Sequence, residues 1–92
     1  MNVVYHKDLL KILKKLFKKD NSLYLQIISK LKEIQNSKDI NHYKNLKKPL
    51  QNFKRVHISD KFVLIFKYIK TEDLLIFRYF EHRDKVYKKN YD

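Results

Sequence analysis

The first third of the chain places apolar residues and lysines with the period of an α-helix. In residues 7–19, leucine, isoleucine and phenylalanine recur at three- and four-residue steps, with lysines between them. Asp20, Asn21 and Ser22 interrupt this pattern, and all three are residue types that cap helix N-termini. A second apolar stripe then continues to about Gln35. The pattern predicts two amphipathic helices, which the short connection makes antiparallel neighbours.

The other regular segments have the patterns of β-strands. Residues 2–5 suit a short strand, and residues 53–58 alternate between polar and apolar positions. Residues 62–69 are apolar except for one lysine, which predicts a central strand covered on both faces. Residues 74–80 form the last predicted strand. Because the chain has no glycine, the turns between these strands should be loose ones of three to five residues.

The remaining segments connect or follow these elements. Residues 36–52 have a weak pattern and predict an ordered loop with at most one short helical turn. Residues 81–92 are polar and basic, and we expect them to be too short for another packed layer. The order β-α-α-β-β-β predicts an α+β fold, with two N-terminal antiparallel helices packed on one face of an antiparallel sheet. Without repeats or composition breaks, residues 1–92 should form a single domain.

The net charge of +12, from 22 basic and 10 acidic residues, should attract polyanions. Nucleic acid, an acidic protein partner or an anionic membrane would each fit, and a lysine-rich, AT-biased genome could also explain the charge. The absence of cysteine and the scattered histidines argue against a disulfide framework and a metal site. No apolar run has membrane-spanning length, and the first residues lack the features of a signal peptide. We therefore expect a cytoplasmic protein that binds no membrane.

Three segments in the second half of the chain carry a more specific pattern. Residues 53–58, Phe-Lys-Arg-Val-His-Ile, form a basic alternating strand, and an apolar strand begins at Phe62. Residues 81–87 contain the spacing His-Arg-x-x-Val-Tyr directly after the last predicted strand. These segments, in this order of elements, resemble the RelE toxins of the RelE/ParE superfamily. The Arg55-x-His57 pair is also similar to the YafQ branch of that superfamily, which uses histidines.

The resemblance implies a type II toxin that enters the ribosomal A site and cleaves messenger RNA without a metal ion or other cofactor. It also implies three partners: the ribosome, the message and an acidic RelB-like antitoxin that wraps around the toxin in a hetero-oligomer. One departure from the family concerns an arginine that relatives often carry near the start of the middle strand. Lys61 stands near that position here, so the role has moved to Lys61 or been lost.

Metal-free RNA cleavage by the RNA's own 2′-OH needs a base, an acid and fixed positive charge at the phosphate. Histidine suits the proton transfers and arginine suits the phosphate. Because residues two apart on a strand share a face, Arg55 and His57 should project together, as should Arg78 and His82. If both pairs face away from the helices, they share one surface with the tail. The expected catalytic residues are His57, His82, Arg83 and Tyr87, and the expected substrate-binding residues are Arg55, Lys54, Lys61 and Arg78.

Two other functions stay open at this point. A ParE-type inhibitor of DNA gyrase shares the fold and acts by binding a protein, and a non-catalytic RNA-binding module is the third alternative. The acid, base and cationic side chains at the strand and tail positions favour the nuclease. Each residue also has an ordinary interpretation: Arg55, His57 and Arg78 as solvated strand positions, and Tyr87 as an anchor for the tail.

Overall fold

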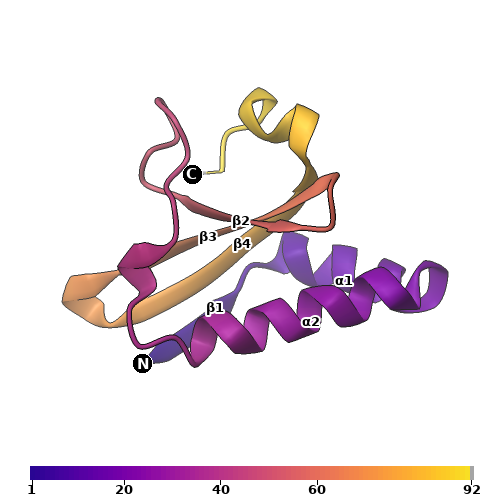
Figure 1. Ribbon diagram of the computed structural model, residues 1–92, viewed down its shortest axis with the longest axis horizontal. Coiled ribbons are helices and arrows are strands. Elements are labelled where there is room, and N and C mark those ends of the chain that lie inside the picture. Colours follow the sequence, from indigo (N-terminus) through magenta and orange to yellow (C-terminus); the bar gives the residue numbers. More distant parts are fainter. Residues whose placement is uncertain (92) are drawn as a thin grey trace.

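The computed structural model describes residues 1–91 and has two helices against one face of a four-stranded sheet (Figure 1). This α+β architecture confirms the predicted fold. The helices and strands are β1 (Asn2–Tyr5), α1 (Lys7–Lys19), α2 (Asn21–Gln35), β2 (Lys54–Ile58), β3 (Phe62–Ile69) and β4 (Leu74–His82). Three short 3₁₀ helices are η1 (Ile40–His42), η2 (Lys70–Glu72) and η3 (Arg83–Lys88).

Side chains that bond to free backbone N–H groups set where both helices begin. The His6 imidazole accepts a hydrogen bond from the backbone N–H of Asp8 at 3.1 Å, at the start of α1. The Asp20 carboxylate accepts from the backbone N–H of Leu23 at 3.1 Å, at the start of α2. Asp20 also ends α1, since its own N–H donates to the Leu16 carbonyl. One residue thus separates the two helices, and both have the bounds that the sequence predicts.

The strand order in the sheet is β1-β4-β3-β2. β2, β3 and β4 pair antiparallel, whereas β1 pairs parallel with β4, so the sheet is mixed and not wholly antiparallel. A parallel pair needs a long crossover connection, which the two helices and the following strands supply. β4 extends two residues beyond the predicted end, because His82 still pairs with Phe62 at the start of β3.

Both faces of the central strand β3 are covered, as predicted, but by different kinds of structure. The helices and the sheet enclose the main core, which includes the fully buried Leu64 and Phe66 of β3. A second core on the opposite face joins the 44–53 loop to the segment after β4, and it contains Leu46, Leu50, Phe53, Val63, Ile65, Val86 and Tyr91. The expectation that residues 81–92 form no packed layer is therefore wrong, since Val86 and Tyr91 are both buried there.

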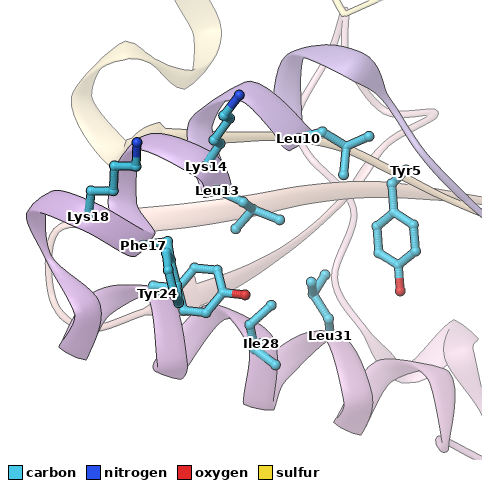
Figure 2. A pocket seen from close by; sticks show the side chains of 9 residues that line it. All are labelled: Tyr5, Leu10, Leu13, Lys14, Phe17, Lys18, Tyr24, Ile28 and Leu31. Atoms are coloured by element: carbon cyan, nitrogen blue, oxygen red, sulfur yellow. The ribbon is translucent and has the colours of Figure 1, made fainter.

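The helix pair leaves an apolar groove of about 580 Å³ open between α1 and α2, with Tyr5 of β1 at one end (Figure 2). Leu10 and Phe17 of α1 line it with 50% and 57% of their surface exposed. Lys14 and Lys18 lie on the same wall. No helix formed by residues 1–91 is long and apolar enough to cross a membrane.

Candidate active site

β2 supplies two of the predicted residues to the sheet face opposite the helices. Val56 and Ile58 contact the main core, so the alternate residues Arg55 and His57 point to the other face. The Arg55 Nη1 atom lies 2.8 Å from Nε2 of His57. A guanidinium can only donate a hydrogen bond, so Nε2 must be the acceptor in this contact. This contact therefore requires the neutral His57 tautomer that carries its proton on Nδ1.

η3 places the other two residues above β2. The backbone N–H of Arg83 donates to the Lys61 carbonyl at 2.8 Å, which ties the start of η3 to the β2–β3 turn. Val86 is buried in the second core and fixes the middle of η3. The hydroxyl oxygen of Tyr87 accepts a hydrogen bond from the backbone N–H of Lys47 at 2.9 Å. With one lone pair used in this way, the hydroxyl keeps its own hydrogen for another acceptor.

Arg55, His57, Arg83 and Tyr87 together line a cavity of about 110 Å³. The other lining residues, Leu46, Val63 and Val86, are apolar, so no carboxylate lines the cavity. The sequence named all four polar residues. The sequence did not predict the hydrogen bond from the Lys47 backbone N–H to Tyr87. The 36–52 segment has no regular pattern, and every residue except proline carries a backbone N–H, so the residue type does not mark this donor.

His82 lies away from this cavity, so the expectation that it shares a surface with Arg55 and His57 is wrong. Its ring packs edge-on against Phe62, which contacts the helix-side core, with 5.6 Å between ring centroids. Its Nδ1 accepts a hydrogen bond from the backbone N–H of Asp84 at 3.2 Å. His82 thereby caps η3, the element that carries Arg83.

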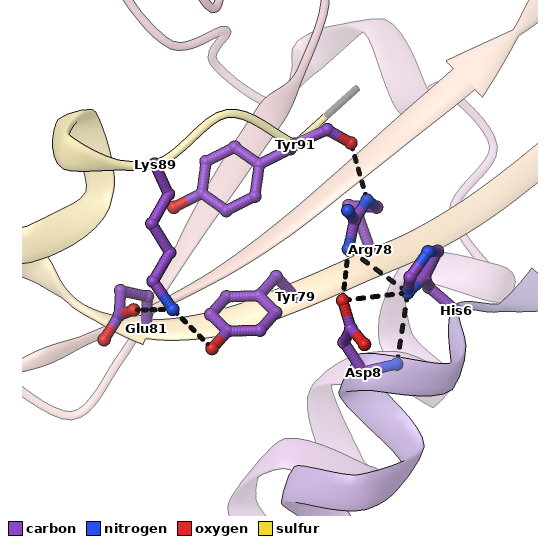
Figure 3. Close-up of polar contacts among 7 residues, drawn as sticks. All are labelled: His6, Asp8, Arg78, Tyr79, Glu81, Lys89 and Tyr91. Atoms are coloured by element: carbon purple, nitrogen blue, oxygen red, sulfur yellow. Dashed lines mark hydrogen bonds and ion pairs between the residues drawn. The ribbon is translucent and has the colours of Figure 1, made fainter.

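Arg78 also lies outside the cavity, at an irregularity in β4. Ile65 pairs with Tyr79 and Phe66 pairs with Phe77, which leaves Arg78 without a partner on β3. This β-bulge inverts the alternation of the residues that follow, because one extra residue shifts the pleat by one position. Regular pairing would have turned residue 82 away from the helices, which is the orientation that strand alternation in the sequence predicts. Figure 3 shows the Arg78 guanidinium among groups from α1 and the C-terminal segment.

The two predicted substrate-binding lysines do not line the cavity either. The Lys54 ammonium donates to the Tyr43 carbonyl at 3.1 Å and to the Asn45 side chain at 2.8 Å. Burial lowers the pKa of Lys54 from its ordinary value, and the nearby Asp39 charge partly opposes that shift. Lys61 is exposed in the turn between β2 and β3. Among residues 1–91, no three histidine or carboxylate side chains lie close enough to hold a metal ion.

Sequence comparison gives the family of this chain. No protein-family model matches it. A protein of Methanocaldococcus jannaschii named "Putative toxin RelE4" is 46% identical over 79 residues, which cover 86% of this chain and 82% of that protein. The chain belongs to the RelE toxin family. An uncharacterized protein of Methanosarcina mazei is 37% identical to this RelE toxin over 73 residues, which cover 79% of this chain and 83% of that protein.

Solved toxin structures share the fold of this RelE chain. A YoeB/ParE toxin from Agrobacterium tumefaciens superposes with a TM-score of 0.69 at 10% identity, covering 83% of this chain and 91% of that one. YafQ from Escherichia coli superposes with a TM-score of 0.65 at 18% identity, covering 94% of this chain and 97% of that one. A copper-bound variant of a Helicobacter pylori toxin superposes with a TM-score of 0.64 at 20% identity, covering 94% of this chain and 98% of that one. These structures show a shared fold, while the 46% identity to the Methanocaldococcus jannaschii protein makes this chain a toxin of the RelE type.

Proposed function

We propose that this RelE toxin is a ribosome-dependent endoribonuclease that cleaves messenger RNA in the A site without a metal ion. The observation that carries the proposal is the convergence of an imidazole, a phenol and two guanidinium groups on one small cavity. Its volume of about 110 Å³ suits a phosphate and not a whole nucleotide. The cavity can therefore grip one ribose–phosphate linkage, and the ribosome would hold the rest of the message.

The geometry favours His57 as the general base. Its Nε2 lone pair is the atom that accepts from Arg55, so it is available to a 2′-OH once the phosphate draws the guanidinium away. The 2′-oxygen then attacks phosphorus as its proton passes to Nε2. Arg55 and Arg83 would bind the phosphate oxygens, on which negative charge grows as the new bond forms.

Tyr87 fits the role of general acid. Its hydroxyl already accepts from the Lys47 N–H, so it can direct its hydrogen towards the departing 5′-oxygen. The same N–H would stabilise the charge left on the phenol oxygen after transfer. The products are a 2′,3′-cyclic phosphate and a 5′-hydroxyl. His82, as the cap of η3, would act by positioning Arg83 and Tyr87.

The partners proposed for this toxin are the ribosome with its message and an acidic RelB-like antitoxin, in a cytoplasmic hetero-oligomer. The charge of +12 supports binding to ribosomal RNA, which would weaken as salt concentration rises. The apolar groove of Figure 2 supports the binding of a helical segment of the antitoxin. Leu10 and Phe17 would meet its apolar side, and Lys14 and Lys18 would meet acidic side chains flanking it.

The alternative is a ParE-type inhibitor of DNA gyrase, for which the cavity would have no catalytic use. Addition of the toxin to a translating extract, with mapping of the 5′ ends of the message, separates the two. Cuts within codons at stalled ribosomes are the expected result. An intact message together with inhibited DNA supercoiling would overturn the nuclease proposal in favour of the gyrase inhibitor.

A further inference from the structure

The side chain of Arg78 connects three parts of the molecule that are distant in sequence. Its Nε donates to the backbone carbonyl of Tyr91 at 2.6 Å (Figure 3). Its Nη1 lies 3.5 Å from the Asp8 carboxylate and 3.2 Å from Nδ1 of His6, at the start of α1. Only 15% of the side chain is exposed. Its donors are thus directed to groups within the protein, and little of it is available to a substrate.

Tyr91, the residue that Arg78 holds, is the anchor of the C-terminal segment. Its side chain is 3% exposed and contacts Phe53 and Tyr79 across the second core, each at 5.8 Å between ring centroids. Its hydroxyl donates to the Val86 carbonyl at 2.9 Å. This bond closes the segment back onto η3 at Val86, the residue that precedes Tyr87.

Lys89 makes a second attachment between the same segment and β4. Its ammonium donates to the Tyr79 hydroxyl at 2.6 Å and pairs with Glu81 at 3.1 Å (Figure 3). This lysine is exposed, so water screens its ion pair and the pair stabilises the attachment only weakly. The less exposed contact to Arg78 should therefore hold the segment more firmly.

We propose that Arg78 is a positioning residue that fastens the C-terminal segment through Tyr91 and so keeps Arg83 and Tyr87 above Arg55 and His57. This inference rests on the proposed nuclease function for its catalytic consequence. Arg78 acts through the tail and does not touch the RNA, which differs from the substrate-binding role predicted from its position in the strand. The bulge in β4 leaves Arg78 without a partner on β3, and its side chain lies between the start of α1 and the tail.

Limited trypsin digestion of the full-length protein tests the fastening without any assay of activity. Lys85, Lys88 and Lys89 provide cleavage sites within the fastened segment. Arg78→Ala should speed cutting there by at least about tenfold. Arg78→Lys, which can still donate to the Tyr91 carbonyl, should restore most of the protection. An unchanged cutting rate in Arg78→Ala would overturn the proposal.

Asp8→Asn is the matched control, because it removes the ion pair with Arg78 and leaves the bond to Tyr91. We expect its tail to be cut at the wild-type rate. If trypsin cut the Asp8→Asn tail as fast as the Arg78→Ala tail, the proposal would be overturned, because the contact between Arg78 and α1 would then be what holds the segment.

Ribosome-bound message cleavage tests the positioning step. Arg78→Ala should lower turnover by at least about tenfold, with the half-saturating ribosome concentration unchanged. Tyr91→Ala should do the same, because it removes the ring that anchors the same segment. The double variant should be no slower than the slower single variant, because both substitutions loosen that one segment. Multiplied losses in the double variant would show that Arg78 acts on the RNA directly and would overturn the proposal. If the wild-type toxin cuts no message, the nuclease function fails, while the trypsin test still decides the fastening.

Discussion

Arg55 donates a hydrogen bond to His57 across one pleat of β2, with 2.8 Å between Nη1 and Nε2. The two side chains share a face because they are two residues apart on the strand. The bond fixes which histidine nitrogen carries the lone pair, and His57 lines the cavity together with Tyr87. A phosphate would compete with His57 for the guanidinium, so substrate binding would itself free the base.

Replacement of His57 by alanine tests the base. We expect message cleavage to fall by about 10²–10⁴-fold, which is the usual contribution of a general base. The side chain is exposed, so the fold should be retained. His42→Ala is the control, since His42 is also exposed and lies in η1 outside the cavity. Cleavage by His57→Ala at the rate of His42→Ala would rule out this role.

Tyr87→Phe removes the proposed acid and keeps the ring. Cleavage should slow by about 10²-fold, while the lost bond from Lys47 should cost only about 1 kcal/mol of unfolding free energy. Tyr68→Phe is a matched control, because it removes a hydroxyl that donates to Asp73 at 2.7 Å away from the cavity. Equal cleavage rates for the two variants would show that the Tyr87 hydroxyl transfers no proton.

Two substitutions of His82 separate capping from chemistry. His82→Ala should lose about 1 kcal/mol of stability and slow cleavage, because η3 loses its N-cap. His82→Asn retains a side-chain acceptor and should cleave at close to the wild-type rate. Loss of cleavage in both variants, with stability preserved in the asparagine variant, would instead place the imidazole in the reaction. His82→Ala combined with Tyr87→Phe should abolish toxicity and leave antitoxin binding intact.

The groove between the helices predicts where the antitoxin binds. Phe17→Glu places a carboxylate among apolar groove residues and should weaken antitoxin binding by at least about tenfold in calorimetry. Leu25→Glu is the matched control, because Leu25 is 56% exposed, close to the 57% of Phe17, and lies outside the groove. Both variants should keep cleavage activity. Equal affinities for the two variants would contradict binding in this groove.

Tyr91 should make the stability of the protein fall at high pH. Burial raises the pKa of Tyr91 from 10.0 to about 12. Above pH 10 the unfolded chain releases the phenol proton more readily than the folded one, so ionisation favours unfolding. The contribution should be fully present below pH 10 and should fall by about 2 kcal/mol as the pH approaches 12. Urea unfolding from pH 8 to 12 should show this loss in the wild type and a smaller one in Tyr91→Phe.

Local signals determined the helices. Apolar periodicity and a single capping aspartate, Asp20, gave both helices their observed bounds, because capping and helix period act within a few residues. The same local logic placed Arg55 and His57 on one face of β2. The motif after the last strand named Arg83 and Tyr87, although η3 as a 3₁₀ helix was not predicted.

The tertiary structure decided which of these groups meet. Lys47 reaches Tyr87 across 40 residues of sequence, and no local pattern encodes a contact between a loop amide and a tail hydroxyl. Strand alternation is cumulative, so the extra residue at Arg78 turned His82 to the helix side. Packing of the tail gave the Arg78 guanidinium its acceptor, the Tyr91 carbonyl. The sequence by itself determined the chemistry available and the elements that carry it. Packing of the tail and one bulge in the sheet decided which side chains reach the cavity, because both depend on pairing between segments far apart in the chain.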